Sequence, residues 1–420
     1  MSVKVEKIDT RELRVGMYVS QLDRPWIETP FPLQGFHIRS EDEVAKLRIF
    51  CKYVYIDLKL GVGPVETEHA AAPRKAPSKA GARGPVRGAV GKFTPVRYQV
   101  TQPLKREVAQ ATAHHRDLTR AMVHMMGQLR EGRSLNPVLA RKAATVVVQS
   151  VLRNPDAMIW LARLKDKDSY SYNHGVRSSI LAAVFGRHLG LPQDVLENLT
   201  AGAMLMDVGN VRVPRSLLTT CERDMDAEDR KALRAHVQHG VDILEEAGNY
   251  HDQVIGVVQF HHERYDGSGY PFGLSGTAIP LLARIASIVD TYDAVTSPRP
   301  WADPVSPTEA VSMLYEQRDA KFQGSLVEQF IQSIGVYPTG TLVELSNGEV
   351  GVVIAQNPNR RLRPKVMVVT DAGKNALAQP KVVDLMAVHQ DEAGGNLSVK
   401  SSLMPGAFGV DPGKLQVNAA

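Results

Sequence analysis

The middle of the chain shows a helical spacing of apolar residues in nearly every segment from about residue 103 to residue 335, and Gly and Pro mark the breaks between segments. A run of this length can bury a core of its own and still leave room for an active site. We therefore expect a mainly α protein whose principal domain is a helical one over residues 101–337.

Short runs with β character mark both ends of the chain. RELRVGMYVSQLD and YVYID flank SEDEVAKLRIF, which opens with a Ser N-cap and has the pattern of one amphipathic helix. We expect a small α+β module over residues 1–60. Near the other end, GTLVELSNGEVGVVIA places Asn347-Gly348 between two β-rich runs, a strong hairpin signal, and PKVMVV and KVVDLMAV add strands. A small β domain is expected over residues 338–392, followed by a disordered tail over 393–420.

The positive net charge belongs to one segment. From His69 to Val100 the chain has seven Lys or Arg residues and no Asp or Glu, so removing them from the total of +5 leaves −2 for the rest. This stretch is rich in Ala, Pro and Gly and lacks apolar periodicity, so residues 61–100 are expected to form a flexible, solvated linker. Nucleic acid is an unlikely partner, because only this linker would favour it.

Two further features bear on where the chain works. The N-terminus MSVKVEKIDT has no apolar core of a signal peptide, and no window reaches the roughly 18 uninterrupted apolar residues of a membrane helix. We expect a cytoplasmic protein without a membrane partner. Its two cysteines, Cys51 and Cys221, provide neither a disulfide framework nor a zinc site by themselves. The sequence gives no signal for the oligomeric state.

The strongest chemical signal is HHERYDGSGYP, residues 261–271, in which two adjacent histidines precede an acid and a Gly-rich turn. Adjacent imidazoles point about 100° apart on a helix and rarely both pack in a core, which favours a role as ligands. Other candidates lie on separate expected helices: His174, Asp207, His236 and Asp290. Together these groups have the composition of a dinuclear Fe, Mn or Zn hydrolase site. The scattered histidines are expected to be solvent-facing or packed in the core: His114, His115, His124, His188 and His251.

From Tyr170 to Tyr337 the chain resembles the HD-GYP family, the metal-dependent phosphodiesterases of the HD superfamily that cleave cyclic di-GMP in bacteria. HHERYDGSGYP and the following IPLLARIASIVDTYDAVTSPRPW carry the resemblance. VGMYVSQLDRPWIETPFPLQGF and GTLVELSNGEVGVV also resemble modules that flank this domain in one branch of the family. The resemblance implies an HD-type helical bundle between the two small modules, cyclic di-GMP as ligand, and diguanylate cyclase domains as candidate partners.

The resemblance also implies roles for individual residues. The metal ligands would be His174, Asp207, His236, His261, His262 and Asp290, with Asp207 and His236 the catalytic pair. The substrate-binding residues would be Arg264, Asp266, Gly269, Tyr270, Pro271 and Arg299. The implied cofactor is a divalent metal, Fe or Mn.

The stretch MLMDVGN departs from the family pattern. The His that should precede Asp207 is Met206, and the Lys that closes the motif and should face substrate phosphate is Asn210. A Glu that adds a third metal in some members is here Tyr170. A thioether is a poor replacement for imidazole at a hard divalent ion. We therefore expect fewer ions than in intact members and weak or lost hydrolysis.

Three alternatives stay open at this point. The chain could be a catalytically inactive module that binds cyclic di-GMP or a partner protein. His239, three residues after His236, could replace the missing imidazole. A water molecule could also complete the metal's shell and leave a slow enzyme.

Overall fold

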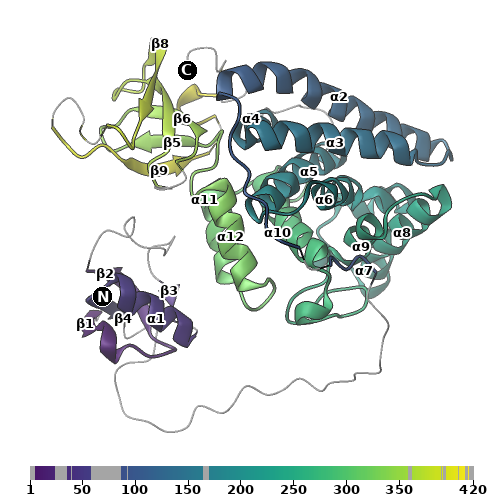
Figure 1. The fold of residues 1–420 in the computed structure, drawn as a ribbon, viewed down its shortest axis with the longest axis horizontal. Helices are drawn as coiled ribbons and strands as arrows, with labels where there is room; N and C mark the ends of the chain where they lie inside the picture. The colour runs from purple at the N-terminus through teal and green to yellow at the C-terminus, as the bar shows by residue number, and fades with distance from the viewer. Residues whose placement is uncertain are drawn as a thin grey trace. The chain divides into compact units, whose positions relative to one another are not determined.

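The computed structural model describes residues 5–23, 36–38, 40–57, 87–91, 93–163, 170–357, 362–388, 390, 394–404, 406–411 and 415. It divides the chain into two compact units, Met1–Arg83 and Gly84–Ala420. The second unit is mainly helical with a small sheet at its C-terminal end, which confirms the expected fold class (Figure 1).

The first unit is a small α+β module, as expected. Its antiparallel sheet has the order β1-β4-β2-β3, with strands β1 (Val5–Asp9), β2 (Tyr18–Leu22), β3 (Phe36–His37) and β4 (Tyr53–Asp57). Helix α1 (Glu41–Phe50) buries Val44 and Leu47. The Ser40 side chain accepts a hydrogen bond from the Glu43 amide, which confirms the predicted N-cap.

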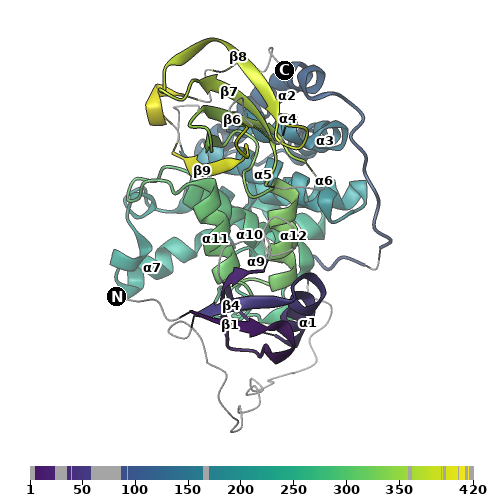
Figure 2. The same cartoon turned by 90° about the vertical axis from the view of Figure 1, so that its left-hand side faces the viewer.

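The helices of the second unit pack around α5, which contacts α6, α10, α3 and α12. Figure 1 shows α5 in the middle of this group, and Figure 2 shows the same elements from the side. Its apolar face, with Ile180 and Phe185, is fully buried. The helices are α2 (Leu104–Arg130), α3 (Pro137–Arg153), α4 (Pro155–Ala162), α5 (Tyr170–His188), α6 (Gln193–Leu205), α7 (Ala227–Arg234), α8 (His236–Ala247), α9 (Asp252–Phe260), α10 (Leu281–Thr296), α11 (Pro307–Glu316) and α12 (Gly324–Ile334).

One glycine sets the approach of two of these elements. After α6 the chain turns into a short 3-10 helix, η3 (Val208–Arg212), that packs against α8. A Cβ on Gly209 would lie 1.9 Å from the carbonyl oxygen of His236 and 2.5 Å from the amide nitrogen of Gly240. Only a residue without a side chain permits this contact, and the contact brings Asp207 beside the start of α8.

The C-terminal part of the second unit is a five-stranded antiparallel sheet of order β8-β7-β6-β5-β9. Its strands are β5 (Leu342–Leu345), β6 (Val350–Ala355), β7 (Lys365–Thr370), β8 (Ala376–Asp384) and β9 (Val399–Leu403). The predicted hairpin joins β5 to β6, and Gly348 in its turn has φ of +85°. Val343, Val353, Val366 and Val368 form the core beneath the sheet.

The structure moves two expected boundaries. The tail predicted to be disordered contains β9, which pairs with β5, and Leu397 is only 4% exposed. The predicted linker over residues 61–100 also ends earlier. Arg87 forms ion pairs with Glu245 and Asp252, and the Val96 amide donates to the Gly190 carbonyl. These contacts are ion pairs and backbone hydrogen bonds, which leave no apolar period in the sequence. Residues 58–86 lie outside the part of the chain that the structure describes.

No helix in the described ranges is long and apolar enough to cross a membrane.

A buried carboxylate ties α2 to α3. Glu107 is 0% exposed and accepts hydrogen bonds from the Ser150 hydroxyl at 2.6 Å and from Nε and a terminal nitrogen of Arg153 at 2.7 and 2.9 Å. All three donors belong to α3, so this one side chain links α2 to α3 through three hydrogen bonds.

We expect Glu107→Ala to lower the free energy of unfolding by about 3 kcal/mol, because it leaves the half-buried Arg153 guanidinium without its partner. Asp117→Ala on the same helix is the matched control. Its exposed ion pair with Arg120 has an N to O distance of 3.8 Å, so its loss should cost less than about 0.5 kcal/mol. Urea unfolding of both variants tests this, and equal effects would contradict the role given to Glu107.

Candidate metal centre

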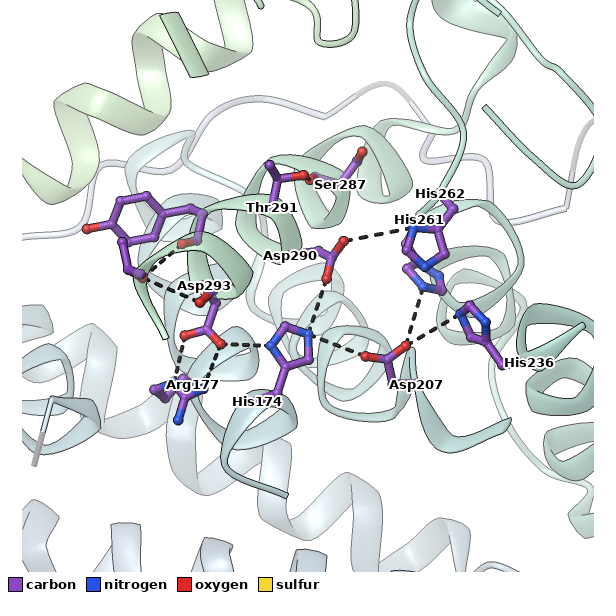
Figure 3. A network of polar contacts seen from close by, with 12 residues as sticks. His174, Arg177, Asp207, His236, His261, His262, Ser287, Asp290, Thr291 and Asp293 are labelled. Carbon is purple, nitrogen blue, oxygen red and sulfur yellow. Dashed lines mark hydrogen bonds and ion pairs between the residues drawn. The ribbon is translucent and has the colours of Figure 1, made fainter. Parts of the chain in front are cut away.

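The structure brings all six predicted ligands together from five separate segments. His174 lies on α5, Asp207 directly follows α6, and His236 opens α8. His261 and His262 end α9, and Asp290 lies on α10. Their potential ligand atoms form two overlapping groups, within each of which all atoms lie no more than 4.8 Å apart (Figure 3). One group is Asp207, His236, His261 and His262, and the other is His174, Asp207 and Asp290.

Asp207 belongs to both groups and directs one oxygen toward each. Its Oδ1 is 3.5 Å from Nε2 of His236 and 3.9 Å from Nε2 of His261. Its Oδ2 is 3.4 Å from Nε2 of His174, which also lies 3.1 Å from Oδ1 of Asp290. This arrangement is the one by which a carboxylate spans two cation positions.

The backbone fixes the orientation of two of the imidazoles. Nδ1 of His236 is 2.8 Å from the carbonyl oxygen of Leu233, and Nδ1 of His261 is 2.9 Å from that of Val258. A carbonyl only accepts, so the proton is assigned to each Nδ1 and each Nε2 carries a lone pair. Both Nε2 atoms are buried and have no hydrogen-bond partner among the described residues. Because buried polar atoms are rarely left unpaired, these two fit a bound cation.

Burial also shifts the pKa of several potential metal ligands. It lowers the pKa of His261, and it lowers the pKa of His262 well below the usual value, helped by the neighbouring imidazoles. Burial alone would raise the pKa of Asp290, but its interactions with His174, His261 and Arg264 outweigh burial, and the net pKa is lowered. Neutral imidazoles at His261 and His262 beside an ionised Asp290 suit a divalent cation.

Two residues at the site were not among those predicted from the sequence, Asp293 and Arg177. Asp293 lies one turn after Asp290 on α10, and its Oδ2 is 2.7 Å from Nδ1 of His174. Arg177 donates to both oxygens of Asp293, at 2.7 and 2.9 Å (Figure 3). A carboxylate on the far nitrogen of a ligand His fixes the ring and raises its basicity. The signal in the sequence was the three-residue spacing of the two Asp residues in DTYD.

The two departures from the family pattern lie beside the same site. Met206 is 1% exposed, and Met206 and Asn210 line a cavity that His174 and Asp207 also border. Met122, Met126 and Met204 cover other parts of its wall, so this side of the site is thioether-rich. His239 belongs to neither group of potential ligands among the described residues.

The Gly-rich turn from Asp266 to Pro271, the GYP loop, is held in shape by hydrogen bonds of the residues next to it. Arg264 donates through one terminal nitrogen to the carbonyl oxygens of His261 and Glu263 and to the Ser287 hydroxyl. The buried carboxylate of Glu263 accepts from the amides of Phe272 and Leu274 at 2.8 and 2.9 Å, which closes the loop. No local pattern in the sequence indicates this role of Glu263.

Close packing explains Gly269, where a Cβ would lie 2.3 Å from the Arg264 amide nitrogen. Asp266 is exposed and accepts from the Ser268 amide, and Pro271 is exposed as well. These residues form the turn that carries Tyr270.

Of the predicted substrate-binding residues, Tyr270 lies against the metal ligands. Its ring stacks on that of His262, with centroids 4.7 Å apart and planes at 26°. Arg299 instead forms a backbone bridge with Ala302 and lies over Trp301. No contact in the described ranges links Arg299 to a ligand of the metal groups.

Three family models match the chain. Residues 160–326 match an HD domain, residues 342–390 a KOW domain associated with HD domains, and residues 5–139 a domain of unknown function. The HD match covers His174 to Asp290 and therefore all six predicted ligands.

Whole-chain comparison gives the family. The chain is 32% identical over 383 residues to the cyclic di-GMP phosphodiesterase PA4108 of Pseudomonas aeruginosa, covering 91% of this chain and 89% of the relative. It is 34% identical over 157 residues to the cyclic di-GMP phosphodiesterase response regulator RpfG of Xanthomonas campestris, which is 37% of this chain and 41% of that one. The solved structure of Bd1817, an HDG"Y"P protein from Bdellovibrio bacteriovorus, matches 78% of this chain and 98% of its own with 16% identity and a TM-score of 0.45. On the near full-length match to PA4108, this chain belongs to the HD-GYP family of HD-domain proteins.

Proposed function

We propose that this chain binds cyclic di-GMP at a metal centre and hydrolyses it slowly at most. The observation that carries the proposal is the unequal pair of ligand groups around Asp207, with four potential ligands in one and three in the other. The names of the relatives PA4108 and RpfG as cyclic di-GMP phosphodiesterases support the choice of nucleotide.

The donor set supports Fe or Mn, since mixed imidazole and carboxylate ligands suit both. A divalent ion held there would lower the pKa of bound water and stabilise charge on a phosphodiester. Asp207 and His236 are the residues that we assign to the catalytic position. The group of His174, Asp207 and Asp290 is the one that lacks an imidazole, because Met206 occupies the position next to Asp207 in the chain.

Three further residues, Asp293, Tyr270 and Asn210, affect how the ligand side chains are oriented and how the nucleotide is bound. Asp293 holds the His174 ring, and Tyr270 lies over His262 at the edge of the site. Asn210 is neutral where the family pattern has a cation, so less charge faces a bound phosphate. The alternative is a catalytically inactive protein that binds its ligand at this site and does not hydrolyse it. A cytoplasmic location and diguanylate cyclase partners stay predictions from the sequence.

Purified protein should hold about one ion per chain tightly, because a single ligand group is complete. Elemental analysis after anaerobic, iron-replete purification measures this. Asp207→Asn removes a shared ligand and should bring the content close to zero. Two or more tightly held ions in the wild-type protein would contradict the unequal ligand groups.

Restoring the family residues should restore the reaction. We expect Met206→His combined with Asn210→Lys to raise the rate of cyclic di-GMP hydrolysis by roughly 100-fold, since it returns an imidazole ligand and a phosphate-facing charge. Met206→Leu with Asn210→Gln is the matched control and should leave the rate of hydrolysis unchanged. If the restored variant is no faster than the wild-type protein, the limitation lies outside these two positions.

We expect Asp293 to affect metal binding, because it fixes the His174 ring. In the Met206→His background, Asp293→Asn should weaken binding of the second ion by about 10- to 100-fold, because the amide no longer fixes the His174 ring. Asp117→Asn on the exposed face of α2 serves as control. Titration with Mn²⁺ measures the affinities, and unchanged binding in Asp293→Asn would rule out this positioning role.

A further inference from the structure

Three side chains form a stack at the edge of the metal centre. The Tyr270 ring lies on that of His262, and the guanidinium carbon of Arg234 lies 4.6 Å from the Tyr270 ring centroid. Arg234 is the last residue of α7, two positions before the ligand His236. The His236 ring meets His262 edge-on at 5.0 Å. Arg234 is therefore linked to His262 through the stacked Tyr270 ring, and to His236 through the chain, in which it lies two positions earlier. Both histidines belong to the complete ligand group.

The charge of Arg234 is only lightly engaged. Its Nε donates to Oε1 of Glu222 at 2.7 Å, and the two side chains are 42% and 39% exposed. No other hydrogen bond from Arg234 occurs within the described ranges. A solvent-exposed ion pair contributes only about 0–1 kcal/mol, so an anion with better geometry can replace Glu222.

Two other arginines near the loop are committed elsewhere. Arg264 donates to backbone carbonyls and to Ser287, and Arg230 donates to the carbonyl oxygens of Glu222 and Met225. Arg234 instead presents a planar guanidinium that aromatic stacking holds in place. Such a group binds phosphate in a bidentate manner and loses little side-chain entropy when it does so.

We infer that Arg234, held on Tyr270, binds a phosphate of the nucleotide. Without ligand, the Arg234 guanidinium is paired with the Glu222 carboxylate. When the nucleotide binds, its phosphodiester replaces Glu222 as the partner of Arg234. This inference rests on the proposed function, because it takes cyclic di-GMP as the ligand of the same site. It also gives Tyr270 a physical task, which is to hold this guanidinium over its ring.

Calorimetric titration of metal-loaded, full-length protein with cyclic di-GMP tests the inference. We expect Arg234→Gln to weaken binding by roughly 10- to 100-fold, as for loss of a charge-assisted phosphate contact. Arg234→Lys should keep part of the affinity, and Glu222→Gln should raise it a few-fold by removing the competing carboxylate. Arg120→Gln, an exposed Arg on α2, should bind like the wild-type protein.

Three further readouts separate phosphate binding from a structural role. Metal content and melting temperature should be unchanged in Arg234→Gln, and the salt dependence of binding should become shallower. Equal affinity of Arg234→Gln and wild-type protein, or a loss explained by lost metal, overturns the inference. If the wild-type protein does not bind cyclic di-GMP at all, the proposed function fails instead. The same variants titrated with inorganic phosphate then decide whether Arg234 binds a phosphate, and equal affinities there overturn the inference as well.

Discussion

The arrangement of the whole site depends on the position of one carboxylate, Asp207. It follows the end of α6, and the bare backbone of Gly209 lets the next turn lie directly on α8. Each oxygen of Asp207 therefore faces a different set of imidazoles, one from α8 and α9 and the other from α5. A side chain at Gly209 would push the 3-10 helix away from His236 and separate the two halves of the site.

The imidazoles of the two sets, which belong to the two groups of potential ligands, are held in place by different contacts. His236 and His261 are fixed by their own backbone, since each donates Nδ1–H to a carbonyl oxygen of the preceding turn. His174 is fixed by side chains, through Asp293 and the Arg177 that neutralises it. The first set keeps all its donors. The second set has both its carboxylates and the imidazole of His174 in place, yet it borders a methionine-lined cavity where the family pattern has a further imidazole. The side chains that hold His174 are thus in place on the side of the site where Met206 lies.

Much of this could be predicted from the sequence. The adjacent histidines, the Gly-rich loop and the Asn-Gly hairpin are local patterns with local physical causes, and the six predicted ligands do converge. What could not be predicted depends on contacts between distant segments. Asp293 acquires its role only because α5 lies against α10, and Glu263 only because the GYP loop folds back over it. The docking of Arg87 uses ion pairs, which leave no apolar periodicity to detect. The pairing of β9 with β5 joins segments more than 50 residues apart, and Leu397 and Val399 pack on the sheet's core only once that pairing exists. For Arg264, the hydrogen bonds to the His261 carbonyl and to Ser287 could not be predicted from the residue type, and its role in substrate binding stays a prediction.

The central claim is that one of the two cation positions around Asp207 is complete and the other is not. Anomalous X-ray scattering at the Fe or Mn edge, from crystals of metal-loaded protein, tests it most directly. The account predicts one strong peak coordinated by Asp207, His236, His261 and His262, and a weak peak or none between His174 and Asp290. Two peaks of equal strength would contradict it.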